Sequence, residues 1–154
     1  MYAAHAAAAA GQNPLGNIEV TPEWETLARA VAAESYQQWK ANVTPEARAR
    51  AEAEHAKYLS GDQEYISGKM ASLNALFVES DANGDGRLNF DEYNVFEAGL
   101  IEQSKADGTF VEPRADHTQR TWEVYSGVNP AEEGFSYAEW LGAAGKFMAY
   151  YKEC

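Results

Sequence analysis

The sequence predicts an all-α fold, and three observations lead to this prediction. Apolar side chains recur at spacings of three and four residues through most of the chain, which is the period of an amphipathic helix. Alanine, the strongest helix former, is the most common residue. Apolar and polar residues nowhere alternate for long, so we expect no strand of more than a few residues.

We expect an N-terminal helical pair in residues 19–61. A threonine that can cap a helix, Thr21, stands before a proline suited to the first helical position, and apolar residues then share one face over about 22–41. A second Thr-Pro pair starts a helix over about 46–59. Only a few residues separate these two helices, so we expect a helical hairpin or a sharp bend. The alanine-rich residues 1–18 are expected to be a tail.

Four more helices are expected in residues 62–154, each from one apolar face at helical spacing. Asp62 is positioned to cap the first of them. Turn-forming residues separate the others, including a linker over residues 105–113. The expected spans are about 63–80, 91–104, 114–125 and 137–151.

The charge of the chain points to a cation as its partner. The 154 residues carry a formal net charge of −12. The acid is uneven: residues 1–60 hold five basic and seven acidic side chains, and residues 61–154 hold seven and seventeen. This balance argues against nucleic acid or an anionic membrane surface as a partner. We therefore expect a cation to bind in the second part of the chain.

Several other classes of protein are excluded. The single cysteine, Cys154, rules out an intrachain disulfide, and no apolar run reaches the length of a membrane span. We find no zinc pattern, phosphate-binding glycine loop or nucleophilic serine motif, and His5, His55 and His117 lack ligand spacing. We therefore expect an intracellular, cytoplasmic protein that is not an enzyme.

The segment from residue 81 to residue 92 carries the chemistry. Oxygen-bearing side chains occupy its first, third, fifth, ninth and twelfth positions, and a hard cation such as Ca²⁺ binds about six to eight oxygens. Alternate residues of a loop that wraps around an ion point inward, so these oxygens can converge. The five side chains belong to Asp81, Asn83, Asp85, Asn89 and Glu92.

The remaining positions of this segment fit the same loop. Gly86 permits a sharp turn with a positive φ. Arg87 would offer its backbone carbonyl oxygen, which leaves its side chain free to point to solvent. Leu88 points the other way, into the core. Glu92 begins the next helix and can supply both carboxylate oxygens.

This segment resembles the loop of the EF-hand calcium-binding proteins at every consensus position, and apolar residues flank it as they flank that loop. The resemblance implies that Ca²⁺ binds here. It also implies an EF-hand pair, in which two helix–loop–helix units meet through a short strand contact at the eighth loop residue. The implied ligands are Asp81, Asn83, Asp85, Arg87, Asn89 and Glu92.

A second, degenerate hand is expected around residues 126–139. Residues 134–140 are similar to residues 87–93, which puts Phe135 in the place of Leu88 and Glu139 in the place of Glu92. The upstream ligands are missing, so we expect this loop to keep the fold without binding an ion. The alternative is that three glutamates gather a cation loosely there, namely Glu132, Glu133 and Glu139.

The resemblance implies a calcium-responsive interaction module that works through one functional loop. The alternative is a structural subunit or adaptor of a larger assembly, with a constitutive calcium ion. The N-terminal helices carry an aromatic face of Trp24, Tyr36 and Trp39. This face either packs as an internal helix into the cleft of the EF-hand pair or presents a surface to a protein partner.

Overall fold

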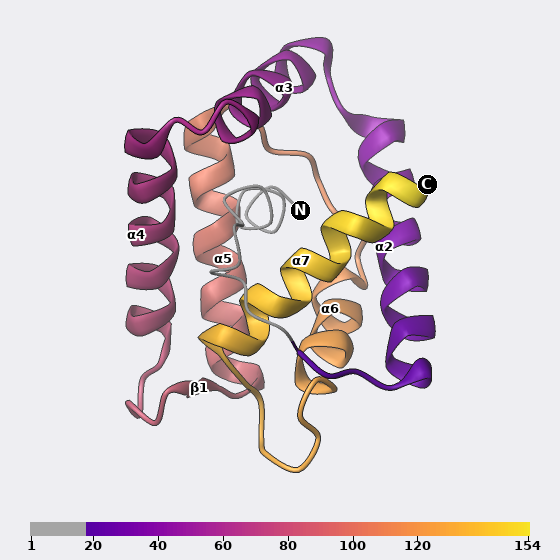
Figure 1. Ribbon diagram of the computed structural model, residues 1–154, viewed down its shortest axis with the longest axis vertical. Helices are drawn as coiled ribbons and strands as arrows, with labels where there is room; N and C mark the ends of the chain where they lie inside the picture. The colour runs from indigo at the N-terminus through magenta and orange to yellow at the C-terminus, as the bar shows by residue number, and fades with distance from the viewer. Residues whose placement is uncertain (1–17) are drawn as a thin grey trace.

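The structure is a computed structural model that describes residues 18–154, so the expected tail lies outside the described residues apart from Ile18. The described chain is mostly helical with one small antiparallel sheet, which agrees with the all-α prediction (Figure 1). None of the helices in this range is long and apolar enough to span a membrane. The elements are α2 (Pro22–Asn42), α3 (Pro45–Leu59), α4 (Gln63–Ser80), β1 (Arg87–Leu88), α5 (Phe90–Asp107), α6 (His117–Ser126), β2 (Phe135–Ser136) and α7 (Tyr137–Glu153).

The first three helices begin where their capping residues predict. The side chains of Thr21, Thr44 and Asp62 each accept a hydrogen bond from the backbone N–H three residues on, at 3.1 Å. A side-chain oxygen in this position satisfies a donor that the helix leaves unpaired. The capping signals in the sequence therefore locate these helix starts to within a residue.

Two helix ends in the middle of the chain differ from the expectation. Helix α5 continues to Asp107 and is capped by Gly108, because the polar residues after Ser104 extend the helix without adding to its apolar face. Helix α6 begins at His117 instead of near residue 114. A local turn precedes it, in which the Arg114 side chain bonds to the Asp116 carboxylate at 3.0 Å.

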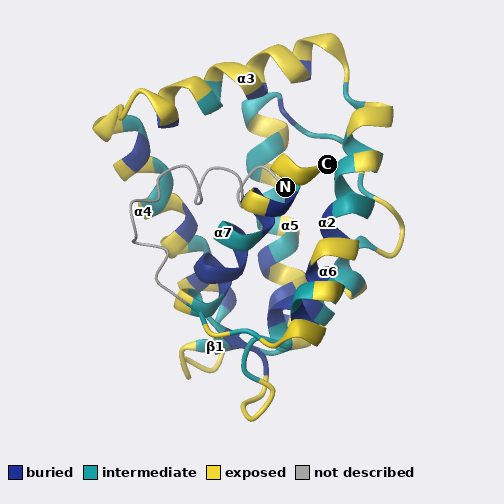
Figure 2. Ribbon diagram, turned by 45° about the vertical axis from the view of Figure 1, so that its right-hand side comes forward, coloured by how far each residue is buried: buried dark blue, intermediate teal, exposed yellow. Residues whose placement is uncertain are grey.

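The N-terminal helices form a sharp bend and not a hairpin. Figures 1 and 2 show α3 crossing one end of the molecule from α2 to α4. Helix α3 packs against α4. The two residues between α2 and α3, Val43 and Thr44, are both extended, so the chain turns away from α2 instead of folding back along it. The Arg48 guanidinium lies over the Trp39 ring, 5.5 Å from its centre, across the bend.

The aromatic face of α2 is used inside the chain. Helix α2 packs along α6 and α7, on the far side of the molecule from α4 (Figure 1). The indole N–H of Trp24 donates to the Val124 carbonyl oxygen at 2.8 Å, and the Tyr36 ring stacks on that of Tyr151 with centroids 6.2 Å apart. These contacts show that Trp24 and Tyr36 pack inside the chain, against α6 and α7.

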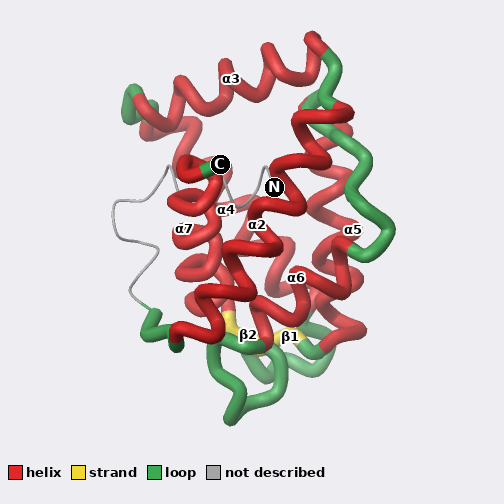
Figure 3. Tube along the Cα trace, turned by 90° about the vertical axis from the view of Figure 1, so that its right-hand side faces the viewer, coloured by secondary structure: helices red, strands yellow, loops and turns green. Residues whose placement is uncertain are grey.

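The two-residue strands connect the α4–α5 segment with the α6–α7 segment at one end of the molecule (Figure 3). Strand β1 pairs antiparallel with β2, and Leu88 lies opposite Phe135. Both side chains are fully buried, as the comparison of the two segments predicts. The Phe135 ring packs edge-on against Phe77 of α4 and Tyr93 of α5, so the sheet continues into the aromatic core that the helices enclose (Figure 2).

Gly134 provides a test of this strand contact. A Cβ atom at this position would lie 1.8 Å from the Leu88 carbonyl oxygen, and the Gly134 φ of +71° is unfavourable for other residues. We expect Gly134→Ala to lower the free energy of unfolding by about 3 kcal/mol, because the backbone must move to relieve the overlap. Urea denaturation followed by circular dichroism measures the change.

The matched control is Gly68→Ala on the exposed face of α4. A Cβ atom there meets nothing within 4 Å, so the alanine should be neutral or stabilise the helix by up to about 1 kcal/mol. Unfolding midpoints that are equal for Gly134→Ala and the wild type would show that β1 and β2 do not approach each other this closely.

Candidate metal centre

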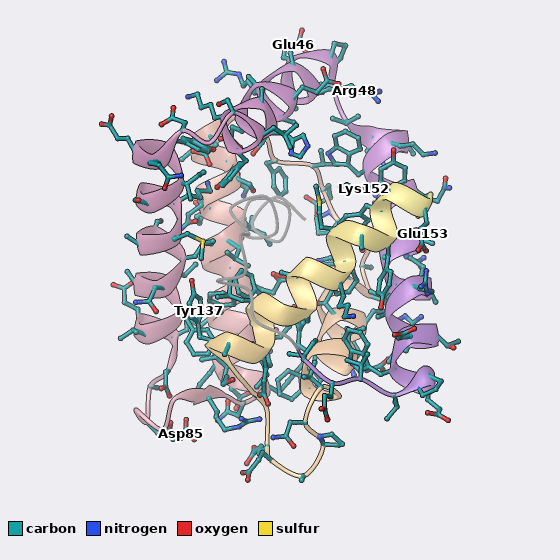
Figure 4. All side chains as sticks on the ribbon, in the orientation of Figure 1. Glu46, Arg48, Asp85, Tyr137, Lys152 and Glu153 are labelled. Carbon is teal, nitrogen blue, oxygen red and sulfur yellow. The ribbon has the colours of Figure 1, made fainter. Side chains whose placement is uncertain are left out.

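The loop between α4 and α5 lies at the same end of the molecule as the sheet, and Asp85 stands near its tip (Figure 4). Its sharp turn is made at Gly86, whose φ is +81°, as the sequence predicts. Leu88 leaves the loop toward the core and is fully buried. The polar side chains of the loop can therefore converge on the side of the loop opposite to Leu88.

Three carboxylates converge in this loop. One oxygen each from Asp81, Asp85 and Glu92 lies within 4.8 Å of the others. Two oxygens that bind one Ca²⁺ at about 2.4 Å can be at most about 4.8 Å apart, so this spacing is compatible with a single ion. The structure thus brings together the first, fifth and twelfth residues of the expected loop.

Backbone N–H groups hold these carboxylates in place. The Gly86 N–H donates to Asp81 Oδ2 at 2.7 Å, and the Arg87 N–H donates to Asp85 Oδ1 at 2.9 Å. Glu92 accepts from Asn89 N–H at 2.9 Å and from the N–H of residue 83 at 3.3 Å, one bond to each oxygen. Glu92 therefore ties the start of α5 to the start of the loop, and its side chain is buried.

The two asparagines support the loop through their own side chains. The Asn83 amide oxygen accepts from the Asp85 N–H at 3.2 Å, which tightens the turn. The Asn89 amide oxygen accepts from the Glu92 N–H at 2.9 Å, and together these two residues form the capping box of α5. Both asparagines lie beside the carboxylates, at positions that the sequence singles out.

One buried oxygen of the carboxylate cluster has no hydrogen-bond partner. Asp81 Oδ1 is buried and accepts no hydrogen bond. In the part of the chain that the structure describes, no basic side chain pairs with Asp81, Asp85 or Glu92. Three like charges this close repel one another, and a buried oxygen without a partner is costly. A bound cation would remove both costs.

The Arg87 side chain does not point to solvent, and the sequence-based expectation for it is wrong. Its guanidinium crosses to the second loop, where it pairs with the Glu139 carboxylate at 3.0 Å. It also donates to the carbonyl oxygens of Glu133 and Gly134. The contact spans 46 residues or more, and no local pattern at Arg87 marks it.

The second loop holds its acidic residues differently. Glu139 accepts from the Ser136 N–H at 2.8 Å and forms the capping box of α7, whereas Glu132 and Glu133 are exposed. Within residues 18–154, the one group of three His, Cys, Asp or Glu side chains able to share an ion is that of residues 81, 85 and 92. The three glutamates of the second loop are thus not gathered for an ion.

A second polar feature lies at a cavity of about 100 Å³ between α2, α5 and the segment before α6. His117 Nε2 and Glu97 Oε1 are 3.2 Å apart at its wall, with 19% and 12% of their side chains exposed. Burial alone raises the pKa of Glu97, but the hydrogen bond and charge of His117, together with a hydrogen bond from Tyr93, hold that pKa below its ordinary value. Sequence reasoning missed this pair.

Comparison with known proteins gives no relative. No protein-family description matches the chain, and neither a curated protein nor a solved structure shows significant similarity to it. The inference of function therefore rests on the residues and their geometry.

The Glu97–His117 pair predicts a pH-dependent stability. Because the folded pKa of Glu97 is lowered from 4.5, its contribution is complete above pH 4.5 and is lost as the pH falls through the folded value. We expect the wild type to exceed Glu97→Gln by about 1–3 kcal/mol at pH 7, and by much less at pH 3. Urea unfolding at the two pH values measures the difference.

The control is Glu102→Gln on the same helix, whose carboxylate is exposed and pairs with Lys105 three residues on. It should change the unfolding free energy by less than about 0.5 kcal/mol at either pH. A stability gap between wild type and Glu97→Gln that stays constant from pH 7 to pH 3 would contradict the lowered pKa.

Proposed function

We propose that this chain is a calcium-binding protein of the EF-hand type, with one Ca²⁺ held by the loop from residue 81 to residue 92. The observation that carries the proposal is the convergence of Asp81, Asp85 and Glu92, together with the buried oxygen of Asp81 that has no partner. The full ligand set would add the side chain of Asn83, the backbone carbonyl of Arg87 and, through a water, Asn89.

The donor set suits Ca²⁺ better than a transition metal or Mg²⁺. All the donors are oxygens, which hard cations prefer, and no histidine or cysteine belongs to the cluster. Glu92 can offer both carboxylate oxygens, and Ca²⁺ accommodates such bidentate binding more readily than the smaller Mg²⁺.

We further propose that α4–α5 and α6–α7 form an EF-hand pair whose second hand is degenerate. Three observations support this. The strands pair with Leu88 opposite Phe135. Both outgoing helices begin with a capping box, made by Glu92 in one and Glu139 in the other. The incoming and outgoing helices pack against each other within each proposed hand.

Calcium in the first loop would act by fixing the angle between α4 and α5. Glu92 belongs to α5 and reaches back to the start of the loop, so an ion shared by Glu92 and Asp81 would join the two helices. Apolar side chains are exposed on both of these helices, including Val78 at 64% and Val95 at 59%. This supports a calcium-responsive interaction module with its surface on α4–α5, a role that involves no catalytic step.

A second candidate is a structural subunit or adaptor with a constitutive ion. It is favoured by the exposed apolar side chains of α4 and α5, because Val78 and Val95 would suit a permanent interface as well as a calcium-dependent one. The calcium affinity separates the two roles. Dissociation constants near micromolar are typical of sensors, and much tighter binding would indicate a permanent ion.

Calorimetric titration of Ca²⁺ into the wild type and Glu92→Gln tests the proposal. We expect one ion per wild-type chain, and an affinity at least about 100-fold lower in Glu92→Gln because a neutral amide replaces a charged, bidentate ligand. The control is Glu79→Gln, an exposed position on α4 outside the cluster, which should bind like the wild type. Circular dichroism checks that each variant is folded.

Two results would contradict the proposal. No heat of binding in a folded wild type at two well-separated temperatures would rule out the calcium site. Equal affinities for Glu92→Gln and the wild type would place the ion elsewhere on the chain.

A further inference from the structure

The Arg87 guanidinium is surrounded by oxygens of the second loop. Its Nε donates to the Glu133 carbonyl at 2.9 Å, and its Nη2 donates to the Gly134 carbonyl at 3.0 Å. Its Nη1 lies 3.0 Å from Glu139 Oε1. The side chains of Arg87 and Glu139 are 21% and 17% exposed, so the contact is largely shielded from water.

Glu139 holds the same place in the second loop that Glu92 holds in the first. Each is the third residue of its helix, and each accepts the N–H of the capping residue, at 2.8 Å from Ser136 and 2.9 Å from Asn89. The surroundings differ in charge. Glu92 faces two further carboxylates, whereas Glu139 faces the positive charge of Arg87.

We infer that the Arg87 guanidinium is the resident cation of the second loop and takes the place that a metal ion would fill. One carboxylate oxygen and two carbonyl oxygens are donors that a hard cation would use. The guanidinium donates N–H groups of its fixed planar fork to the two carbonyl oxygens, and its positive charge pairs with the carboxylate. Because it is covalently part of the first loop, it is present at every calcium concentration.

The inference deepens the proposed function, on which it rests only for the comparison with a metal ion. Arg87 contacts both loops at once. Its backbone N–H donates to Asp85 Oδ1 in the first loop, while its guanidinium holds Glu133, Gly134 and Glu139 in the second. The second loop would therefore stay attached to the first without metal. Any ion in the first loop would bind to a loop already anchored at its seventh residue.

An ordinary surface ion pair would contribute little to stability, commonly about 0–1 kcal/mol. The chain contains such a pair for comparison. Arg48 and Glu52 lie four residues apart on α3, their side chains are 52% and 71% exposed, and a single distance of 3.4 Å joins them. The Arg87 contact has two hydrogen-bond acceptors beside its ion-pair partner and about a third of that exposure, so it should be measurably stronger.

A double-mutant cycle in a calcium chelator tests the inference. Arg87→Met keeps roughly the length of the apolar stem and removes the guanidinium, and Glu139→Gln removes the charge of the partner. We expect each single change to raise the equilibrium constant for urea unfolding about tenfold or more, and the double variant to raise it about as much as one single change. The control cycle of Arg48→Met and Glu52→Gln should be additive, with each change under about threefold.

Hydrogen exchange of the Leu88, Phe135 and Ser136 amides in the chelator gives a second readout. We expect faster exchange in Arg87→Met, and no change in Arg48→Met. Where Arg87→Met does not fold, Arg87→Lys replaces it in the cycle, because lysine keeps the charge without the planar fork. Partial coupling with Glu139 is then expected.

Additive effects of the Arg87 and Glu139 changes, or unchanged amide exchange in a folded Arg87→Met, would overturn the inference. Both measurements are made without calcium, so their failure is distinct from a failure of the first loop to bind Ca²⁺.

Discussion

The pairing of two short strands is the constraint on which the rest of the structure depends. Leu88 and Phe135 face each other in the core. The backbone at Gly134 lies so close to Leu88 that there is no room for a side chain. The strands therefore set where α5 and α7 begin, because each helix starts within two residues of its strand. The helices then enclose one aromatic core, to which α2, α4, α5, α6 and α7 all contribute.

Each of the two loops beside this sheet contains at least one buried or half-buried carboxylate whose negative charge must be balanced, and the two loops differ in how this is done. In the first, backbone N–H groups hold Asp81, Asp85 and Glu92 together, and the cluster would gain stability from an added cation. In the second, Glu139 is matched by a charge from within the chain, that of Arg87. We therefore propose that, of these two similar loops, the first alone binds a metal ion.

Local sequence signals predict the helices and the convergence of three carboxylates, but they do not predict the long-range contacts. Capping threonines located the helix starts, and the spacing of oxygens located the carboxylates, because both depend on residues close in the chain. The Arg87 and His117 contacts join residues from different elements, so no spacing marks them. The sequence contains one signal for the Arg87 contact. Glu139 matches Glu92 but lies in a loop without other ligands, so its carboxylate needs another partner.

The most direct test of the calcium site is anomalous diffraction from crystals of the full chain grown with Ca²⁺. We predict one strong anomalous peak within about 2.3–2.6 Å of oxygens from Asp81, Asp85 and Glu92, and density for the Arg87 guanidinium beside Glu139. A peak at Glu139 with Arg87 displaced, or no peak at the three carboxylates, would contradict the assignment of the ion to the first loop.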